Sequence, residues 1–359
     1  MGMWVGREPD NEATTLIQLS GPEHTRRRRP WNRAFNSEAL KGYEEIIDKR
    51  ANQLMETLSR QVGSTNLARW ISFFTFDFMS DMALVLSLYN VSVTEIHESC
   101  IIPRFGGGSE MLREGDKEGV WGALDNSTTL SVALGHSPWL GQYYRLLPVG
   151  AEKRSLFWFI MTNPTIYRRL QDEIDSVFPS GENALDVTKH IHMNYLNAVI
   201  NETLRLLPPV LSGSRRVVER GSGAATFGPH LIPEGTAVFS HFYSIQRDER
   251  YFSPLPETFW PDRWLSESER TSPFGSGYKG PVNVVVDRTA FTPFSFGPSI
   301  CVGKNLALQE LRMVVCLMLQ TFDMRLAEGY DAQRWEKEIE DRLITHTGEL
   351  PVVLTPRKN

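Results

Sequence analysis

The sequence predicts a mainly α-helical fold with a small β-sheet. Three observations favour this class. Apolar residues recur at intervals of three and four in several long segments, and strand-like residues are confined to short stretches beyond Pro209. The 359 residues are also 41% hydrophobic and 23% charged, a composition that buries a core and excludes a disordered tail.

The helices are expected in order along the chain. Residues 37–62 place apolar side chains at helical spacing among charges, which predicts an amphipathic helix. Residues 67–88 are apolar on nearly all sides, which predicts a buried helix. Residues 91–150 contain several glycines and prolines, so we expect loop and short helix there. Further helices are expected from residue 155 to Asn163-Pro164, over 165–177, over 193–207 and over 306–322.

Strands are expected only in the second half of the chain. Residues 216–218 and 236–239 flank the turn-like segment Pro233-Glu234-Gly235, so they are predicted to belong to a small sheet. Residues 343–354, with Gly348 near the middle, are predicted to form a terminal hairpin.

Charge and cysteine content exclude several classes of protein. The net charge of −5 provides no general attraction to nucleic acid or acidic lipid. Cys100, Cys301 and Cys316 are widely spaced, which disfavours a disulfide framework and a zinc site. No segment reaches the roughly 18 apolar residues of a membrane-spanning helix, and the charged first residues do not resemble a signal peptide. We therefore expect a soluble, intracellular protein without a membrane anchor.

The loop that precedes the last long helix is the most informative segment. Gly297 and Gly303 flank Cys301 and allow the backbone to turn tightly and approach a planar ligand. Backbone N–H groups at the start of a helix favour a thiolate, which can bind iron. The residues alone leave a second interpretation open, in which Cys301 is a small buried hydrophobic residue. A phosphate-binding loop is excluded by the glycine spacing and by Asn305.

Phe294-x-x-Gly297-x-x-x-Cys301-x-Gly303 resembles the haem-ligand loop of the cytochrome P-450 monooxygenases. The resemblance is closest to fungal members that act in secondary metabolism. It implies haem (iron protoporphyrin IX) as the cofactor and Cys301 as the axial ligand of its iron. It also implies that Phe294, Gly297 and Gly303 shape the loop around the haem.

Two further motifs precede this loop in the order typical of the family. Glu202-x-x-Arg205 resembles its Glu-x-x-Arg pair, and the segment around Arg263 resembles its Pro-x-Arg segment. Glu202 and Arg205 are three residues apart and lie on one helix face. Because that face is otherwise apolar, the pair needs further hydrogen bonds, which Arg263 can supply. In the family this structural triad holds the cysteine loop in place.

Basic residues gather near the amino end of the chain. By itself the run Arg26–Arg29 suggests a nuclear signal or a nucleic-acid patch, but the net charge and the absence of another basic stripe disfavour nucleic acid. The segment resembles the family helix along one haem edge, which implies that His24 and Arg28 bind a haem propionate. Arg216 resembles another propionate partner, whereas Ser299 replaces an Arg or His that the family often has.

The family's central helix carries an acid and an alcohol that relay protons, and no segment of this chain resembles that motif. We therefore expect one incomplete cytochrome P-450 domain over residues 1–359. It would consist of an amino-terminal helical block, 1–153, and a carboxy-terminal haem-ligand block, 154–359, joined at a seam near 152–156. The lid helices and most of the central helix are expected to be missing, and no catalytic residue is identified.

The resemblance implies a haem-thiolate monooxygenase that hydroxylates a lipophilic small molecule with dioxygen. Its expected partner is an NADPH-dependent cytochrome P-450 reductase, which supplies the electrons. The family usually resides on the endoplasmic reticulum membrane, although this chain is expected to be soluble. The alternative is a catalytically defective remnant of the family that binds haem weakly or acts as a non-enzymatic binding protein.

Overall fold

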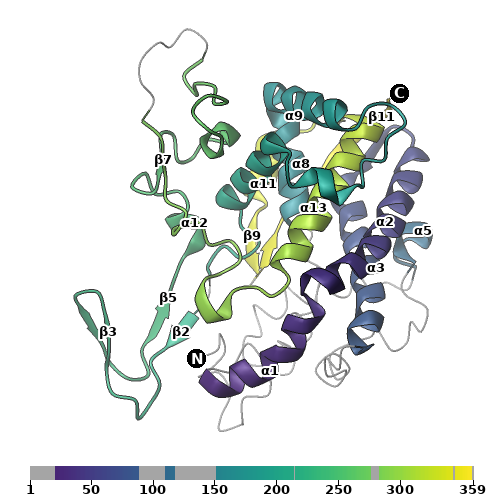
Figure 1. Ribbon diagram of the computed structural model, residues 1–359. Helices are drawn as coiled ribbons and strands as arrows, with labels where there is room; N and C mark the ends of the chain where they lie inside the picture. The colour runs from purple at the N-terminus through teal and green to yellow at the C-terminus, as the bar shows by residue number, and fades with distance from the viewer. Residues whose placement is uncertain are drawn as a thin grey trace.

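A group of helices forms the body of the protein, with the carboxy-terminal strands among them, and other short strands extend from one side (Figure 1). The computed structural model describes residues 21–88, 110–117, 151–213, 215–275, 283–342 and 344–357. The predicted class, mainly α-helical with small sheets, is confirmed.

The helices of the described residues follow the apolar periodicity of the sequence. The observed helices begin or end within a few residues of the predicted limits, and residues 67–88 form one helix as expected. The α-helices are α1 (Gly21–Ala34), α2 (Ser37–Ser59), α3 (Leu67–Leu88), α5 (Met111–Glu114), α8 (Ala151–Thr162), α9 (Pro164–Val177), α10 (Val187–His190), α11 (Asn194–Leu206), α12 (Phe242–Ile245), α13 (Lys304–Thr321) and α14 (Ala332–Lys337), and the 3-10 helices are η3 (Pro261–Trp264) and η4 (Gly297–Ser299).

Local side-chain chemistry fixes the limits of these helices. The Asn36 side chain accepts hydrogen bonds from the backbone N–H groups of Glu38 and Ala39, so it caps the start of α2. Helix α8 ends before Asn163, and Pro164 begins α9 at a position where its missing N–H costs nothing. The predicted helix end at Asn163-Pro164 is confirmed, and the Asn36 cap explains why α2 begins at Ser37.

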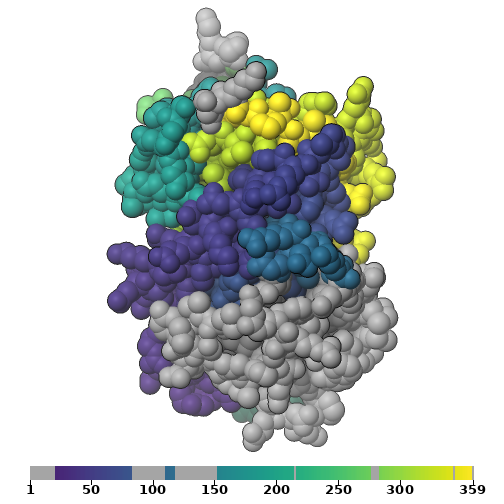
Figure 2. All heavy atoms as spheres, turned by 90° about the vertical axis from the view of Figure 1, so that its right-hand side faces the viewer, coloured from purple at the N-terminus to yellow at the C-terminus, as the bar shows by residue number. Residues whose placement is uncertain are grey.

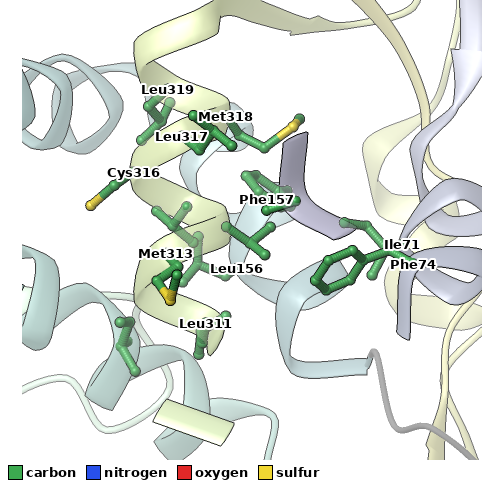
Figure 3. Packing of buried hydrophobic residues seen from close by; sticks show 14 of the residues in the cluster. Ile71, Phe74, Leu156, Phe157, Leu311, Met313, Cys316, Leu317, Met318 and Leu319 are labelled. Carbon is green, nitrogen blue, oxygen red and sulfur yellow. The ribbon is translucent and has the colours of Figure 1, made fainter. Parts of the chain in front are cut away.

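Helix α13 lies in the centre of the hydrophobic core. Figure 3 shows Leu156 and Phe157 of α8 between α13 and the side chains Ile71 and Phe74 of α3. Cys316 of α13 is also fully buried in this core, as its apolar neighbours in the sequence predict. The helix that follows Cys301 is thus held on several sides by packing.

The largest sheet of the described residues joins distant parts of the chain. Strand β11 (Pro351–Pro356) pairs antiparallel with both β1 (Ser64–Asn66) and β8 (Phe322–Leu326). In Figure 2 the yellow carboxy-terminal residues accordingly lie next to the purple and blue helices α2 and α3.

The terminal hairpin predicted over 343–354 is wrong. Strand β10 (Ile344–His346) pairs instead with β9 (Glu340–Arg342), while β11 joins the larger sheet. Gly348 packs so closely against Glu338 that an added Cβ would lie 2.0 Å from a carboxylate oxygen. Gly348 thus lies where the chain passes close to Glu338, and β10 finds its partner on the amino-terminal side of residue 343.

The other strands form two-stranded antiparallel sheets. Strand β2 (Arg215–Val217) pairs with β5 (Ala237–Phe239), so the two segments belong to a small sheet as predicted. The remaining pairs are β3 (Ala225–Phe227) with β4 (His230–Ile232), and β6 (Phe252–Ser253) with β7 (Val285–Val286).

Charged residues are buried at the start of α8. The Lys153 side chain is 1% exposed, and its Nζ lies 2.9 Å from Glu152 and 3.2 Å from Glu310 of α13. Although burial alone lowers it, these carboxylates raise the pKa of Lys153 above its usual value. An ammonium in this position is stable only because it is paired, so the ion pairs fasten α8 to α13.

Replacement of Lys153 tests how much these ion pairs stabilise the protein. Lys153→Met keeps the aliphatic stem but leaves two buried carboxylates without their shared cation, so we expect the free energy of unfolding to fall by about 3–5 kcal/mol. Urea unfolding followed by tryptophan fluorescence measures the change. Lys117→Met, which breaks an exposed pair with Glu114, is the control and should leave the midpoint unchanged. Equal midpoints for Lys153→Met and the wild type would contradict the assignment.

Candidate functional site

The loop before α13 folds back so that Cys301 stands beside the start of the helix. The backbone N–H of Cys301 donates to the carbonyl of Phe294 at 2.8 Å, and that of Ile300 donates to Gly297 at 3.0 Å. Gly297 has φ of +67°, a conformation that costs little only without a Cβ. Together these bonds place the thiol at one end of a central helix.

The thiol of Cys301 is accessible to solvent, unlike that of Cys316. Enough protein nevertheless surrounds its sulfur that burial raises the pKa of Cys301 above the ordinary value. The backbone N–H groups of Gly303 and Lys304 and the charge of Arg28 act in the opposite direction, as the sequence predicts, but they do not outweigh burial. Without a ligand, burial therefore favours the neutral thiol, whereas a bound metal cation would favour the thiolate.

Two basic residues of α1 and one of β2 gather near this loop. Arg28 of α1 donates from Nη2 to the carbonyl of Ile300 at 2.5 Å, directly before Cys301. Burial, followed by the positive charges of Arg28 and Arg216, lowers the pKa of His24. Figure 1 shows the loop before α13 beside α1 and β2, the elements that carry these residues. The structure thus brings His24, Arg28 and Arg216 together at one edge of the cysteine loop.

Apolar side chains are exposed around the same thiol. Phe296 is 74% exposed and Ile300 is 37% exposed. Large apolar residues grouped on a surface usually mark a binding site. Phe294, by contrast, packs against the core. The face around Cys301 therefore combines a sulfur donor and apolar groups, with cations at its edge.

These residues fit a flat, apolar ligand that has carboxylates at its edge and a metal at its centre. The thiol of Cys301 is the donor for the metal, and the basic residues match the carboxylates. Within the described ranges no three His, Cys, Asp or Glu side chains lie close enough together to hold a metal ion. The iron of haem brings ring nitrogens as ligands, so haem at Cys301 would not need such a cluster.

A buried ion network joins α11 to the chain before the cysteine loop. The Glu202 carboxylate accepts hydrogen bonds from Arg205 Nε and Nη2, both at 2.8 Å, and from Arg263 Nε at 2.9 Å. The backbone N–H of Trp260 and the indole N–H of Trp264 also donate to it. Glu202, Arg205 and Arg263 are all fully buried, so the network consists of charges that no solvent screens.

The two arginines hold the carboxylate in its ionised form. Although burial alone raises it, Arg205 and Arg263 keep the pKa of Glu202 below its usual value. The arginines also donate to backbone carbonyls, Arg205 to Gln246 and Pro256, and Arg263 to Pro254 and Leu255. The network therefore ties α11 to the irregular segment that leads toward the cysteine loop.

Gln246 is a residue of this site that the sequence did not reveal. Its side chain is fully buried and contacts both the end of α11 and the backbone of Thr292, which precedes the cysteine loop. No motif or spacing marks a lone glutamine in a loop, so only the tertiary contacts identify it.

Comparison with known proteins defines the class. The family model for cytochrome P-450 matches residues 154–349, which is more than half of the chain. The chain therefore belongs to the cytochrome P-450 family, whose members are haem-thiolate monooxygenases. The resemblance stated from the sequence motifs is confirmed.

Its relatives include fungal enzymes. The chain is 28% identical to a cytochrome P-450 of Uromyces fabae, over 99% of this chain and 73% of that protein. It is 25% identical to tryprostatin B 6-hydroxylase of Aspergillus fumigatus, over 93% of this chain and 65% of the relative. It is 26% identical to trichothecene C-15 hydroxylase of Fusarium sporotrichioides, over 98% of this chain and 79% of the relative.

The Uromyces relative is longer than this chain within the aligned region. The alignment with the Uromyces protein spans 408 positions against 359 residues in this chain, so at least 49 of its positions have no counterpart here. No helix in the described part of the chain is both long and apolar enough to cross a membrane.

The pH dependence of the stability tests whether Glu202 is ionised in the folded protein. Because its pKa is lowered by folding, its ionised form stabilises the protein above the ordinary pKa of 4.5, and this contribution is lost as the pH falls through the lowered value. Glu202→Gln should reduce the free energy of unfolding by about 3 kcal/mol or more at pH 7. The difference from the wild type should shrink below pH 4.5.

Urea unfolding at several pH values measures this difference. The control is Glu56→Gln, which breaks an exposed pair with Arg60 and should change stability at none of them. A Glu202→Gln deficit that stays constant down to pH 3 would mean that the carboxylate is not held ionised.

Proposed function

We propose that this chain is a haem-thiolate protein whose Cys301 binds the haem iron, and that it hydroxylates a lipophilic small molecule. One observation carries the proposal: Cys301 is exposed in a loop with exposed apolar residues, and Arg28, which lies near His24 and Arg216, bonds to this loop at Ile300. Membership of the cytochrome P-450 family supports the same interpretation.

Each residue of the site has a proposed task toward haem. Cys301 supplies the axial sulfur, while Gly297 and Gly303 keep the loop free of side chains that would obstruct the ring. An added Cβ at Gly303 would lie 3.9 Å from the sulfur of Cys301, and one at Gly297 would meet no atom within 4 Å. Phe294 supports the loop from the core side. His24, Arg28 and Arg216 would bind the propionates through charge-assisted hydrogen bonds.

When bound, haem supplies the chemistry of dioxygen activation, with electrons from an NADPH-dependent reductase, and a cysteine thiolate favours O–O cleavage. The residues of this chain would bind the group and exclude water from its sulfur side. Two of the relatives are named hydroxylases, which supports hydroxylation as the reaction type.

We also propose that the domain is incomplete. The family match begins at residue 154, close to the expected seam at 152–156, and the Uromyces relative has at least 49 positions without a counterpart here. Loss of the lid and most of the central helix is consistent with both findings. A second candidate function follows from this, namely a family remnant that binds haem but does not hydroxylate.

Reconstitution with hemin tests the proposed iron ligand. The reduced, carbon monoxide-treated protein should show the red-shifted Soret band of thiolate ligation, and Cys301→Ala should abolish it because the proposed sulfur ligand is lost. Cys316→Ala is the matched control, since that sulfur is buried in the core, and it should keep the band. A colourless wild-type protein, or a Cys301→Ala variant with an unchanged band, would refute the assignment.

Turnover separates the enzyme from the remnant. The reconstituted protein is mixed with a fungal reductase and NADPH, and NADPH consumption, hydrogen peroxide and hydroxylated product are measured on a panel of indole alkaloids and sesquiterpenes. An enzyme converts at least one compound with NADPH use that exceeds peroxide formation. A remnant without a proton relay releases all of the electrons as peroxide.

Arg28→Ala should weaken hemin retention in either case because a carboxylate partner is lost.

A further inference from the structure

We propose that Gln246 is a positioning residue that couples the end of α11 to the loop that carries Cys301. The inference rests on the proposed function for its link to the iron ligand, but the coupling itself is a property of the protein alone. It assigns a task to a side chain that lies 55 positions before the cysteine in the sequence and within none of the recognised motifs.

The Gln246 side chain uses both ends of its amide. Nε2 donates to the backbone carbonyls of Leu204 at 3.1 Å and Arg205 at 3.0 Å, and Oε1 accepts from the backbone N–H of Thr292 at 2.9 Å. The side chain is fully buried, so water does not replace any of these bonds. A buried amide with every contact satisfied holds its partners in a fixed arrangement.

On one side Gln246 completes the carboxyl end of a helix. Helix α11 ends at Leu206, and the last four carbonyls of a helix have no partner within it. Gln246 satisfies two of them, and Arg247 donates to the next, that of Leu206. Arg205 in turn donates from Nη1 to the backbone carbonyl of Gln246 at 2.7 Å. The glutamine is therefore joined directly to the Glu202 network.

On the other side Gln246 fixes the start of the cysteine loop. The carbonyl of Thr292, whose N–H is held by Gln246, accepts the N–H of Ser295 at 2.9 Å. Ser295 has φ of +65°, a strained value for a residue with a Cβ. Next to it, the carbonyl of Phe294 accepts the N–H of Cys301 at 2.8 Å. A short series of hydrogen bonds thus leads from Gln246 to the proposed iron ligand.

The strained turn explains why such an anchor matters. A residue at positive φ persists only when its surroundings hold it. The turn at Ser295 is joined to the rest of the protein by the Thr292 hydrogen bond as well as by the core packing of Phe294. Removal of the Oε1 contact would leave the N–H of Thr292 unsatisfied in a partly buried position. The turn could then relax, and the register of the Phe294 to Cys301 bond would no longer be fixed.

The test uses the full chain with Gln246→Met, which has a similar shape but forms none of the three hydrogen bonds. Hydrogen–deuterium exchange of the haem-free protein should be about tenfold faster at the Thr292 amide and across 292–301 than in the wild type. Gln53→Met is the matched control. That glutamine is also buried and bonds to Arg50 and Glu110 in another part of the protein, so the 292–301 segment should be unaffected by its loss.

The same variants are then reconstituted with hemin. The fraction that shows the thiolate Soret band in the reduced, carbon monoxide-treated form should fall at least severalfold in Gln246→Met and remain unchanged in Gln53→Met. Gln246→Asn keeps the amide on a stem shorter by one methylene and should give intermediate values in both measurements. If Gln246→Met does not fold, the Gln246→Asn result decides.

The possible outcomes are distinct. Wild-type exchange rates at Thr292 in both Gln246 variants would overturn the coupling. Faster exchange with an undiminished thiolate band would overturn the positioning of Cys301. A wild-type protein without a thiolate band would refute the proposed function instead, and the exchange data would still decide whether Gln246 anchors the loop.

Discussion

The candidate site depends on one buried carboxylate. Glu202 is shielded from water, so its charge is tolerable only because Arg205 and Arg263 approach it in fixed directions. The same arginines donate their remaining N–H groups to backbone carbonyls of the segment between α11 and the cysteine loop. Irregular backbone that has no sheet or helix to satisfy it is thereby ordered around one charge.

The cysteine loop combines requirements that conflict in the free protein. Partial burial favours a neutral thiol at Cys301, whereas nearby backbone N–H groups and Arg28 favour a thiolate. Burial prevails, and the exposed Phe296 and Ile300 leave apolar surface in contact with water. A bound metal with an apolar ring would make both features favourable. The metal cation would neutralise the charge of a thiolate, and the ring would cover the exposed apolar side chains. The partly buried sulfur and the exposed apolar side chains, which are unfavourable in the free protein, therefore favour a ligand of this kind.

Much of the fold could be predicted from local patterns. Apolar spacing placed α2, α3 and α13, because a helix that faces a core must repeat its apolar residues every three or four positions. The pairing of β11 with β1 could not be predicted, since both strands are short and their partners lie almost 290 residues apart. The same limitation produced the wrong terminal hairpin around Gly348, where the choice of strand partner depends on distant residues.

The sequence by itself determined the family, through the spacing of Cys301 and its glycines and through the Glu202 and Arg263 motifs, because the chemistry of a ligand loop requires fixed residues at fixed intervals. Only the tertiary structure decided that burial controls the pKa of the Cys301 thiol and that Gln246 joins the helix end to the loop, and it placed Arg28 in contact with Ile300. These properties depend on distance and on exclusion of water, which arise when remote segments pack and leave no periodic mark in the chain.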